Sequence, residues 1–318
     1  MRQATLLQSR NSNRAPLDDA AEKLSQGQVV ASYGNRMLVE DALGARFPAF
    51  VARRGLRLVC GDHVLWRAAE EGGDVAVVEG LPRTTELARP DSRGRVEVLA
   101  ANVDQVVVVC APEPAPDPFI IDRYLAAAEN MGATAVVACN KTDLPDAAQV
   151  RHLDEFEAVG YPVLRVSAHA QAGLQALQAR LAGHCSILVG QSGVGKSSLL
   201  NALLPGMDVA TATISVATGE GRHRTTATTL YRLPGGGALL DSPGVRDFAP
   251  ALGDPRLAVA GFREIVAAAD YCRFANCRHM KEPGCAVKAG VESGAINPRR
   301  YESYRRLLRL TEDLNSRG

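Results

Sequence analysis

Gly190-Gln191-Ser192-Gly193-Val194-Gly195-Lys196-Ser197 fits the pattern G-x-x-x-x-G-K-S of a phosphate-binding loop. The apolar segment Ser186–Val189 comes directly before it, and Ser197–Leu203 has a helical pattern, which is the strand–loop–helix context that supports such a match. Glycines let backbone N–H groups point at phosphate oxygens, and the positive end of the following helix adds to the attraction. We therefore expect Lys196 to bridge the β- and γ-phosphates of a nucleotide and Ser197 to ligate Mg²⁺.

A second motif, Asn140-Lys141-Thr142-Asp143, indicates which base is bound. It follows the apolar segment Thr134–Cys139, at the carboxyl end of an expected strand, where α/β sheets bind ligands. The Asp143 carboxylate can accept hydrogen bonds from both the N1–H and the exocyclic amine of guanine, whereas adenine would leave it unpaired. The stem of Lys141 can cover the base, and Asn140 can tie this motif to the phosphate loop. The two motifs together predict a site for GTP and GDP.

The order of the two motifs along the chain is unusual. In an ordinary GTPase the phosphate loop comes first, whereas here the guanine motif precedes it. The catalytic domain is therefore expected to be circularly permuted. Apolar segments alternate with helical patterns from about Ala100 onward, and the continuous apolar run Val103–Cys110 is typical of a strand covered on both faces. We expect an α/β domain with a mainly parallel sheet.

Two further segments would complete the nucleotide site. Ser167-Ala168 ends the next expected strand, where a backbone N–H could reach the guanine O6. Asp241-Ser242-Pro243-Gly244 matches D-x-x-G, so that Asp241 would hold Mg²⁺ through water and the Gly244 N–H would sense the γ-phosphate. The expected nucleotide-binding residues are Asn140, Lys141, Thr142, Asp143, Ser167, Ala168, Gly190, Gln191, Ser192, Gly193, Val194, Gly195, Lys196, Ser197, Ser198, Asp241 and Gly244.

The segment Gly221-Arg222-His223-Arg224-Thr225-Thr226 lies between the phosphate loop and Asp241, where a threonine normally completes the Mg²⁺ shell. We favour Thr226 over Thr225 for this role. The expected magnesium ligands are Ser197, Thr226 and Asp241.

The catalytic group is less directly indicated. Val245 stands where many GTPases carry a glutamine that orients the attacking water, and valine cannot do so. His223 is the nearest polar candidate for this catalytic role. The alternative is that His223 is a solvated loop residue with no part in the reaction.

Cys272, Cys277, His279 and Cys285 form the pattern C-x₄-C-x-H-x₅-C. Three thiolates and one imidazole complete a tetrahedral zinc set with no position left for water, which indicates a structural site. The spacing differs from that of an ordinary zinc finger, so two-electron redox chemistry and simple burial are alternatives. Few large apolar residues are available to build a core here, and this favours one structural Zn²⁺ per chain.

Composition indicates a soluble globular protein, with 46% hydrophobic and 22% charged residues. The net charge of +1 gives no overall basic field, so any RNA contact must come from local patches. We find no apolar run long enough for a membrane helix, and the N-terminus lacks the apolar core of a secretory signal. The odd number of cysteines, 7, indicates free or metal-bound thiols in a reducing compartment. We expect a cytoplasmic monomer without membrane association.

Short strands separated by turns precede the α/β region and suggest a small closed barrel of the OB-fold type. The expected strands are Val29–Tyr33, Arg36–Glu40, Phe47–Arg53, His63–Arg67 and Asp74–Glu79. The chain is therefore expected to be multi-domain. Its parts are a flexible N-terminal tail at 1–26, an OB-fold β-barrel for RNA or ribosome binding at 27–98, a central α/β P-loop GTPase domain, circularly permuted, at 99–258, and a helical zinc-binding domain at 259–318.

These features jointly resemble the RsgA (YjeQ) family of GTPases that depend on the small ribosomal subunit. Beyond the phosphate loop and the cysteine pattern, the resemblance rests on Gly61-Asp62-His63-Val64, Leu99-Ala100-Ala101-Asn102-Val103-Asp104, Asp241-Ser242-Pro243-Gly244-Val245, Val291-Glu292-Ser293-Gly294 and Arg300-Tyr301. The resemblance implies late maturation of the small subunit, contact with its rRNA, and GTP hydrolysis that the subunit stimulates. In the family the loop around His223 usually reads G-x-H-T-T-T, and here Arg224 replaces the first threonine.

Two other functions are compatible with the sequence. One is an RNA-binding scaffold whose GTP site is static, and single-turnover hydrolysis separates it from an active enzyme. The other is a permuted GTPase that serves the large subunit. The combination of an OB-like barrel with a C-terminal zinc set argues against this second alternative.

Overall fold

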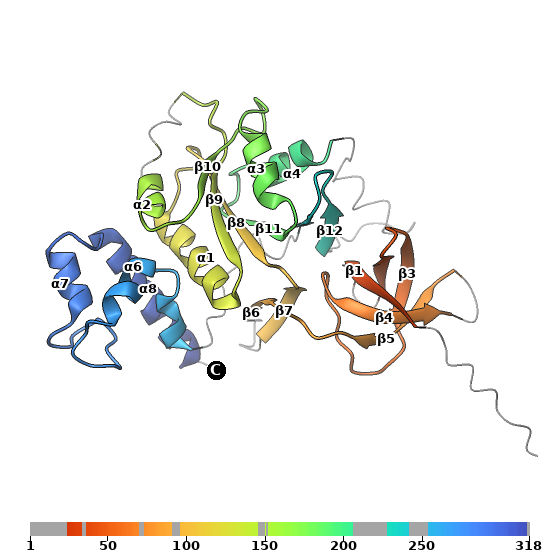
Figure 1. The fold of residues 1–318 in the computed structure, drawn as a ribbon, viewed down its shortest axis with the longest axis horizontal. Coiled ribbons are helices and arrows are strands. Elements are labelled where there is room, and N and C mark those ends of the chain that lie inside the picture. The colour runs from red at the N-terminus through yellow and green to blue at the C-terminus, as the bar shows by residue number, and fades with distance from the viewer. Residues whose placement is uncertain are drawn as a thin grey trace, which may run out of the picture.

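The computed structural model describes residues 24–33, 36–69, 73–90, 96–145, 150, 152–205, 228–241 and 254–316. Its first part is a closed barrel (Figure 1). The barrel strands are β1 (Ser25–Tyr33), β2 (Arg36–Asp41), β3 (Arg46–Val51), β4 (His63–Ala68) and β5 (Val75–Gly80). They pair in the order β1-β2-β3-β5-β4, and β4 pairs with β1 to close the ring. Only the β3–β5 pair is parallel among these described pairings. The expected OB-type barrel is confirmed.

The barrel is joined edge to edge with a second sheet. β1 pairs with β12 (Thr228–Arg232) in antiparallel register, with Ala31 opposite Thr229. Arg232 strengthens the junction because it donates to Glu40 Oε1 at 2.7 Å and to Gln28 Oε1 at 2.8 Å. In the described part of the chain, the result is an 11-stranded sheet that runs from the α/β domain into the barrel.

The α/β part contains the parallel sheet that the sequence predicts. Its strands are β8 (Gln105–Cys110), β9 (Thr134–Cys139), β10 (Val163–Arg165), β11 (Cys185–Val189) and β13 (Ala238–Asp241), in the order β10-β9-β8-β11-β13, followed by antiparallel β12. The helices are α1 (Pro118–Met131), α2 (Leu153–Ala158), α3 (Leu174–Leu181) and α4 (Lys196–Leu203).

Burial explains why β8 is apolar after its first residue, Gln105. All six of its residues are buried, because both faces of the strand are covered. Val106 and Val108 belong to a core that contains Leu125 of α1. Val107 and Val109 point the other way, into a core that contains Leu199 of α4.

A two-stranded hairpin between the barrel and β8 was not expected from the sequence. It consists of β6 (Glu86–Pro90) and β7 (Val96–Ala101).

The expected domain limits stay a prediction. The limit between residues 26 and 27 falls within β1, and the limit between residues 98 and 99 falls within β7. Most of the expected N-terminal tail lies outside the described residues.

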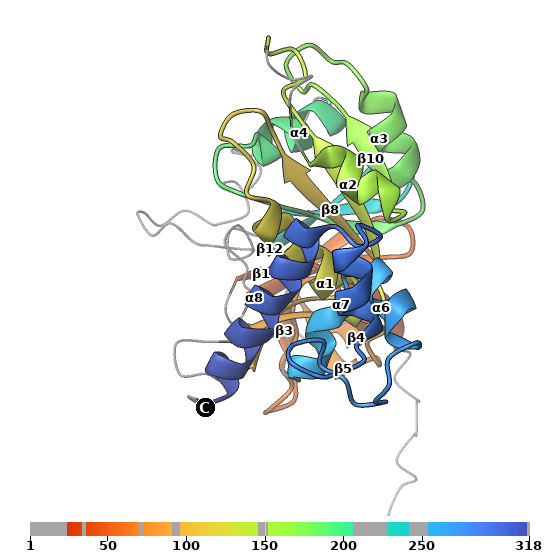
Figure 2. The ribbon, with the colours of Figure 1, turned by 90° about the vertical axis from the view of Figure 1, so that its left-hand side faces the viewer.

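The C-terminal part is helical and packs on α1 (Figure 2). It contains the 3₁₀ helix η3 (Pro255–Val259) and the helices α6 (Arg263–Ala269), α7 (Ala286–Glu292) and α8 (Pro298–Asn315). Phe119 and Ala126 of α1 share one core with Phe262, Ile265 and Leu308 of this part. Among the described residues, no helix has the length and apolar character needed to cross a membrane.

Candidate nucleotide site and metal site

The candidate nucleotide residues gather at one edge of the parallel sheet. The carboxyl ends of β8, β9, β10, β11 and β13 meet at this edge because these strands are parallel. The guanine motif follows β9, Ser167-Ala168 follows β10, and the phosphate loop follows β11. Asp241 is the last residue of β13, and its neighbour Leu240 pairs with Ile187 of β11. Segments that are far apart in the sequence therefore lie together at the carboxyl ends of the strands, which is where open α/β sheets bind their ligands.

The phosphate loop has the backbone conformation that its glycines allow. Gly190 and Gly195 have φ angles of 139° and 91°, in the region that side chains rarely adopt. Lys196, the first residue of α4, donates from Nζ to the carbonyl oxygens of Gly190 and Gln191, both at 2.7 Å. The ammonium group is thereby held over the loop, where it can meet the phosphates. Ser197 and Ser198 are exposed at the start of α4, and Val194 is buried.

Asn140 connects the guanine motif to the phosphate loop. Its side chain is buried, and Nδ2 donates to the Val194 carbonyl at 3.0 Å. Its Oδ1 accepts from the Ala168 N–H at 3.1 Å. Both backbone N–H groups of Ser167-Ala168, the segment expected to reach the guanine O6, therefore already have partners, because the Ser167 N–H donates to the Ala172 carbonyl at 2.9 Å. The amide of Asn140 thus fixes three segments relative to one another.

Asp143 is held by Ser167. The Ser167 hydroxyl donates to Asp143 Oδ1 at 2.5 Å, and this hydrogen bond is the main reason that the pKa of Asp143 lies below its ordinary value. Asp143 Oδ2 also lies 3.6 Å from Nδ1 of the exposed His169. The carboxylate therefore stays ionised, which is the acceptor form that the two donors of guanine need. Ser167 acts here through its hydroxyl, a role that the sequence did not indicate.

The segment 111–117, which connects β8 to α1, also borders the site and was missed by sequence reasoning. Lys141 has a φ of 60° and donates from Nζ to the Glu113 carbonyl at 2.7 Å. The Asp117 N–H lies 3.3 Å from Oε1 of Gln191 in the phosphate loop. The sequence did contain one indication of this role, because the segment directly follows a buried strand, at the edge of the sheet where ligands bind. Thr142 is held by its backbone, whose N–H donates to the Val166 carbonyl at 3.2 Å.

His223, Thr226 and Gly244 lie outside the described residues, as do Thr225 and Val245. The expected assignments of His223 to catalysis, Thr226 to magnesium and Gly244 to the γ-phosphate stay predictions.

The cysteine cluster has the geometry of a metal site. The Sγ atoms of Cys272, Cys277 and Cys285 and one ring nitrogen of His279 lie within 4.8 Å of one another. Cys272 Sγ lies 3.9 Å from Cys285 Sγ and 3.5 Å from His279 Nδ1, and Cys285 Sγ lies 3.6 Å from the same nitrogen. Tetrahedral zinc, with bonds of about 2.3 Å to sulfur and about 2.0 Å to nitrogen, would separate its ligands by about 3.5 to 3.8 Å. These residues fit a four-coordinate metal ion.

The turn that carries His279 is ordered by neighbouring groups. The Glu282 carboxylate accepts from the N–H groups of Met280 at 2.8 Å and Lys281 at 2.9 Å. Burial disfavours the charged form, but these backbone hydrogen bonds outweigh it and lower the pKa of Glu282 to about 2. The Tyr301 hydroxyl of α8 donates to the His279 carbonyl at 2.6 Å. The metal-binding turn is therefore fixed to α8.

The fold and the two sites together define a circularly permuted GTPase with an N-terminal barrel and a C-terminal metal-binding domain. The family model described as RsgA GTPase matches residues 80–250. A relative from Azotobacter vinelandii, named small ribosomal subunit biogenesis GTPase RsgA, is 47% identical over an alignment of 293 residues, and the alignment covers 89% of this chain and 84% of the relative. A relative of the same name from Pseudomonas aeruginosa (strain LESB58) is 44% identical over 286 residues, with the same two coverages. The chain belongs to the RsgA GTPase family, whose members hydrolyse GTP.

Two solved structures have the same architecture. YjeQ from Thermotoga maritima superposes with a TM-score of 0.74 at 32% identity, over 91% of this chain and 99% of that one. YloQ, described as a circularly permuted GTPase, superposes with a TM-score of 0.71 at 24% identity, over 93% of this chain and 97% of that one. The permuted order that the sequence predicts is confirmed.

Proposed function

We propose that this GTPase binds the small ribosomal subunit and hydrolyses GTP to GDP and phosphate late in maturation of the subunit, which in turn stimulates hydrolysis. The observation that carries the proposal is the link that Asn140 makes between the guanine motif and the phosphate loop. This link makes a single guanine nucleotide site from two segments in permuted order. The relatives described above carry the subunit in their names, and they match this chain over most of its length.

Each site residue has a distinct role in this proposal. Asp143 accepts hydrogen bonds from the N1–H and the exocyclic amine of guanine, and Lys196 stabilises the negative charge of the β- and γ-phosphates. Ser197, Asp241 and Thr226 are the proposed Mg²⁺ ligands, and a bound Mg²⁺ would neutralise charge that develops on the phosphate oxygens. Val245 cannot orient water, so hydrolysis by the free protein should be slow. We assign the positioning of the attacking water to His223.

We propose that the metal is zinc, one ion per chain, and that its role is structural. Four protein ligands complete the tetrahedron, so no position is left for water or substrate.

The barrel offers a surface for rRNA. A hollow of about 1000 Å³ is lined by Arg53, Arg54 and Arg57 together with Phe50, whose side chain is partly exposed. Arginines can pair with backbone phosphates, and an exposed aromatic ring can stack on an unpaired base. We propose that the protein works as a monomer in the cytoplasm and that this surface meets the rRNA of the small subunit.

Co-sedimentation with separated ribosomal subunits tests the proposal. We expect the protein with a non-hydrolysable GTP analogue to pellet with the small subunit, and we expect small subunits to raise multiple-turnover GTP hydrolysis. Pelleting with the large subunit alone would instead support the large-subunit alternative. Binding to the small subunit without any hydrolysis would support a static scaffold.

A further inference from the structure

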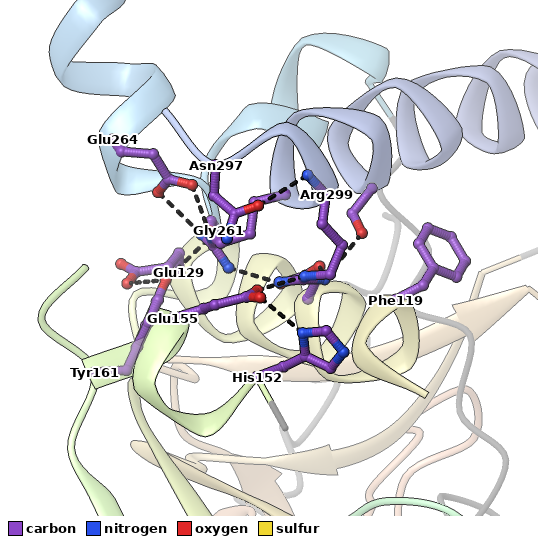
Figure 3. Close-up of polar contacts among 12 residues, drawn as sticks. Phe119, Glu129, His152, Glu155, Tyr161, Gly261, Glu264, Asn297 and Arg299 are labelled. Atoms are coloured by element: carbon purple, nitrogen blue, oxygen red, sulfur yellow. Dashed lines mark hydrogen bonds and ion pairs between the residues drawn. The ribbon is translucent and has the colours of Figure 1, made fainter. Parts of the chain in front are cut away.

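Two adjacent arginines of α8, Arg299 and Arg300, hold the metal-binding domain against the GTPase domain. Figure 3 shows Arg299 together with Glu155. Arg300 donates from Nη1 to Asp122 Oδ1 of α1 at 2.6 Å, and from Nε and Nη2 to the two oxygens of Glu264 on α6 at 2.5 and 3.0 Å. Arg299 donates from Nη1 to Asp122 Oδ2 at 2.7 Å and from Nε to Glu155 Oε2 of α2 at 2.5 Å. We call Arg299 and Arg300, with these three carboxylates, the arginine clamp.

The pair at the centre of the clamp, Arg300 with Asp122, is buried, whereas Arg299 and Glu155 are partly exposed. The side chains of Arg300 and Asp122 are both 0% exposed. Burial raises the pKa of Asp122, and the two arginines oppose this effect. Loss of one partner would leave an uncompensated buried charge, which is strongly destabilising. The clamp therefore keeps α1, α2, α6 and α8 in one arrangement.

Arg299 has a special position because it bridges two elements of the GTPase domain. Asp122 lies on α1, which precedes β9 in the sequence, and Glu155 lies on α2, which follows it. β9 ends at Cys139, directly before the guanine motif. One guanidinium group from the metal-binding domain thus ties together the two helices that flank the guanine-binding segment.

The contact path from the clamp to the nucleotide site is short. The segment 111–117 leads directly into α1, and the Asp117 side chain caps this helix by accepting from the Phe119 N–H at 2.9 Å. The same residue contacts Gln191 of the phosphate loop, and Glu113 accepts from Lys141 of the guanine motif. A shift of α1 would therefore displace contacts to both halves of the site.

We propose that Arg299 is a positioning residue for guanine nucleotide: by bridging Asp122 and Glu155 from α8, it keeps the guanine motif and the phosphate loop ready to bind. The inference rests on the guanine nucleotide site proposed above and is independent of the ribosomal partner. Arg299 does not touch the nucleotide and acts through α1 and α2.

GDP affinity of the free, full-length protein tests this role. Arg299→Ala and Glu155→Gln should each weaken GDP binding by about fivefold or more, within the usual range for coupling between sites. Turnover at saturating GTP should change much less than GDP affinity, because the side chains that act on the phosphates are themselves unaltered and saturating GTP compensates for weaker binding. The double variant should bind GDP no more weakly than Arg299→Ala alone, since both changes break the same bridge. Arg309→Ala removes an exposed arginine from the same helix and should leave GDP affinity unchanged.

Glu155 is partly exposed, so Glu155→Gln should fold even if Arg299→Ala does not, and thermal unfolding checks both. Equal GDP affinity in folded Glu155→Gln and the unaltered protein would overturn the proposed role of Arg299. Additive losses in the double variant would also overturn it. If the unaltered protein bound no guanine nucleotide at all, the proposed function itself would fail.

Discussion

At the scale of single residues, the base site depends on one carboxylate whose direction is set by a neighbour. Ser167 donates to one oxygen of Asp143, which orients the carboxylate and further favours its ionised form. A side chain that is fixed before binding loses little conformational entropy when the base arrives.

Asp143→Asn should weaken GTP binding by roughly 10-fold or more, because an amide cannot accept from both guanine donors. The variant should shift its preference toward xanthosine triphosphate, whose O2 can accept from the amide. Competition binding with the two nucleotides measures the shift, and Asp154→Asn, at an exposed carboxylate of α2, is the matched control. Full GTP affinity in Asp143→Asn would show that the base is bound elsewhere.

His223 is the residue on which catalysis is expected to depend. If it positions the attacking water, His223→Ala should remove most of the turnover stimulated by the small subunit, about 10²-fold, and leave GTP affinity nearly unchanged. Lys196→Ala should damage both binding and turnover. Rapid-quench hydrolysis and nucleotide titration separate the two effects. Full stimulated activity in His223→Ala would place the catalytic group on the ribosome or elsewhere in the chain.

At the scale of elements, the helices and strands that carry the motifs are predictable. The apolar run at 103–110 and the segments around the phosphate loop became β8, β11 and α4. They are predictable because a continuous apolar run and the residue spacing of a phosphate loop are both contained in a short stretch of sequence. The pair β6–β7 was missed, since its stability depends on pairing between two segments rather than on a strong apolar pattern. The pairing of β1 with β12 could not be predicted, because it joins residues that are distant in sequence.

The same distinction holds for the site. Motif residues such as Asn140 and Lys196 were found because their chemistry requires fixed spacings. The segment 111–117 and the arginine clamp were missed, because their contacts are set by how whole helices pack.

Docking of the C-terminal helices on α1 depends on a close backbone approach at Gly261. A Cβ added there would lie 2.5 Å from Ala126 Cα and 2.8 Å from Ala126 Cβ, and this backbone cannot move aside. Gly261→Ala should therefore lower the free energy of unfolding by about 1–3 kcal/mol. Chemical denaturation measures the loss, and Gly235→Ala, where an added Cβ meets open space, is the control. Equal stability of the two variants would contradict the observed packing.

At the scale of the whole molecule, three parts are joined by different physical links. The barrel is attached through backbone pairing of β1 with β12, and the metal-binding domain through a shared core and the arginine clamp. The turn that carries the metal ligand His279 is joined to α8, because Tyr301 and Tyr304 of α8 donate to the carbonyls of His279 and Arg278. The metal site, the clamp and the nucleotide site therefore form one chain of contacts.

This chain of contacts makes a prediction about metal loss. Cys277→Ser should lower the zinc content well below about one ion per chain and destabilise the C-terminal helices, because a complete ligand set is needed for the folding free energy that zinc supplies. The phosphate loop should still bind GDP, but more weakly, by about the same factor as in Arg299→Ala, since both changes release α1 and α2 from α8.

Metal analysis, thermal unfolding and GDP titration measure the three effects, and Cys185→Ser, at a thiol outside the cluster, is the matched control. Combining Cys277→Ser with Arg299→Ala should cause no further loss of GDP affinity, because the clamp can be broken only once. Protein purified without chelator that held no zinc would refute the metal assignment. Full GDP affinity in zinc-depleted Cys277→Ser would instead refute the link between the metal-binding domain and the guanine motif.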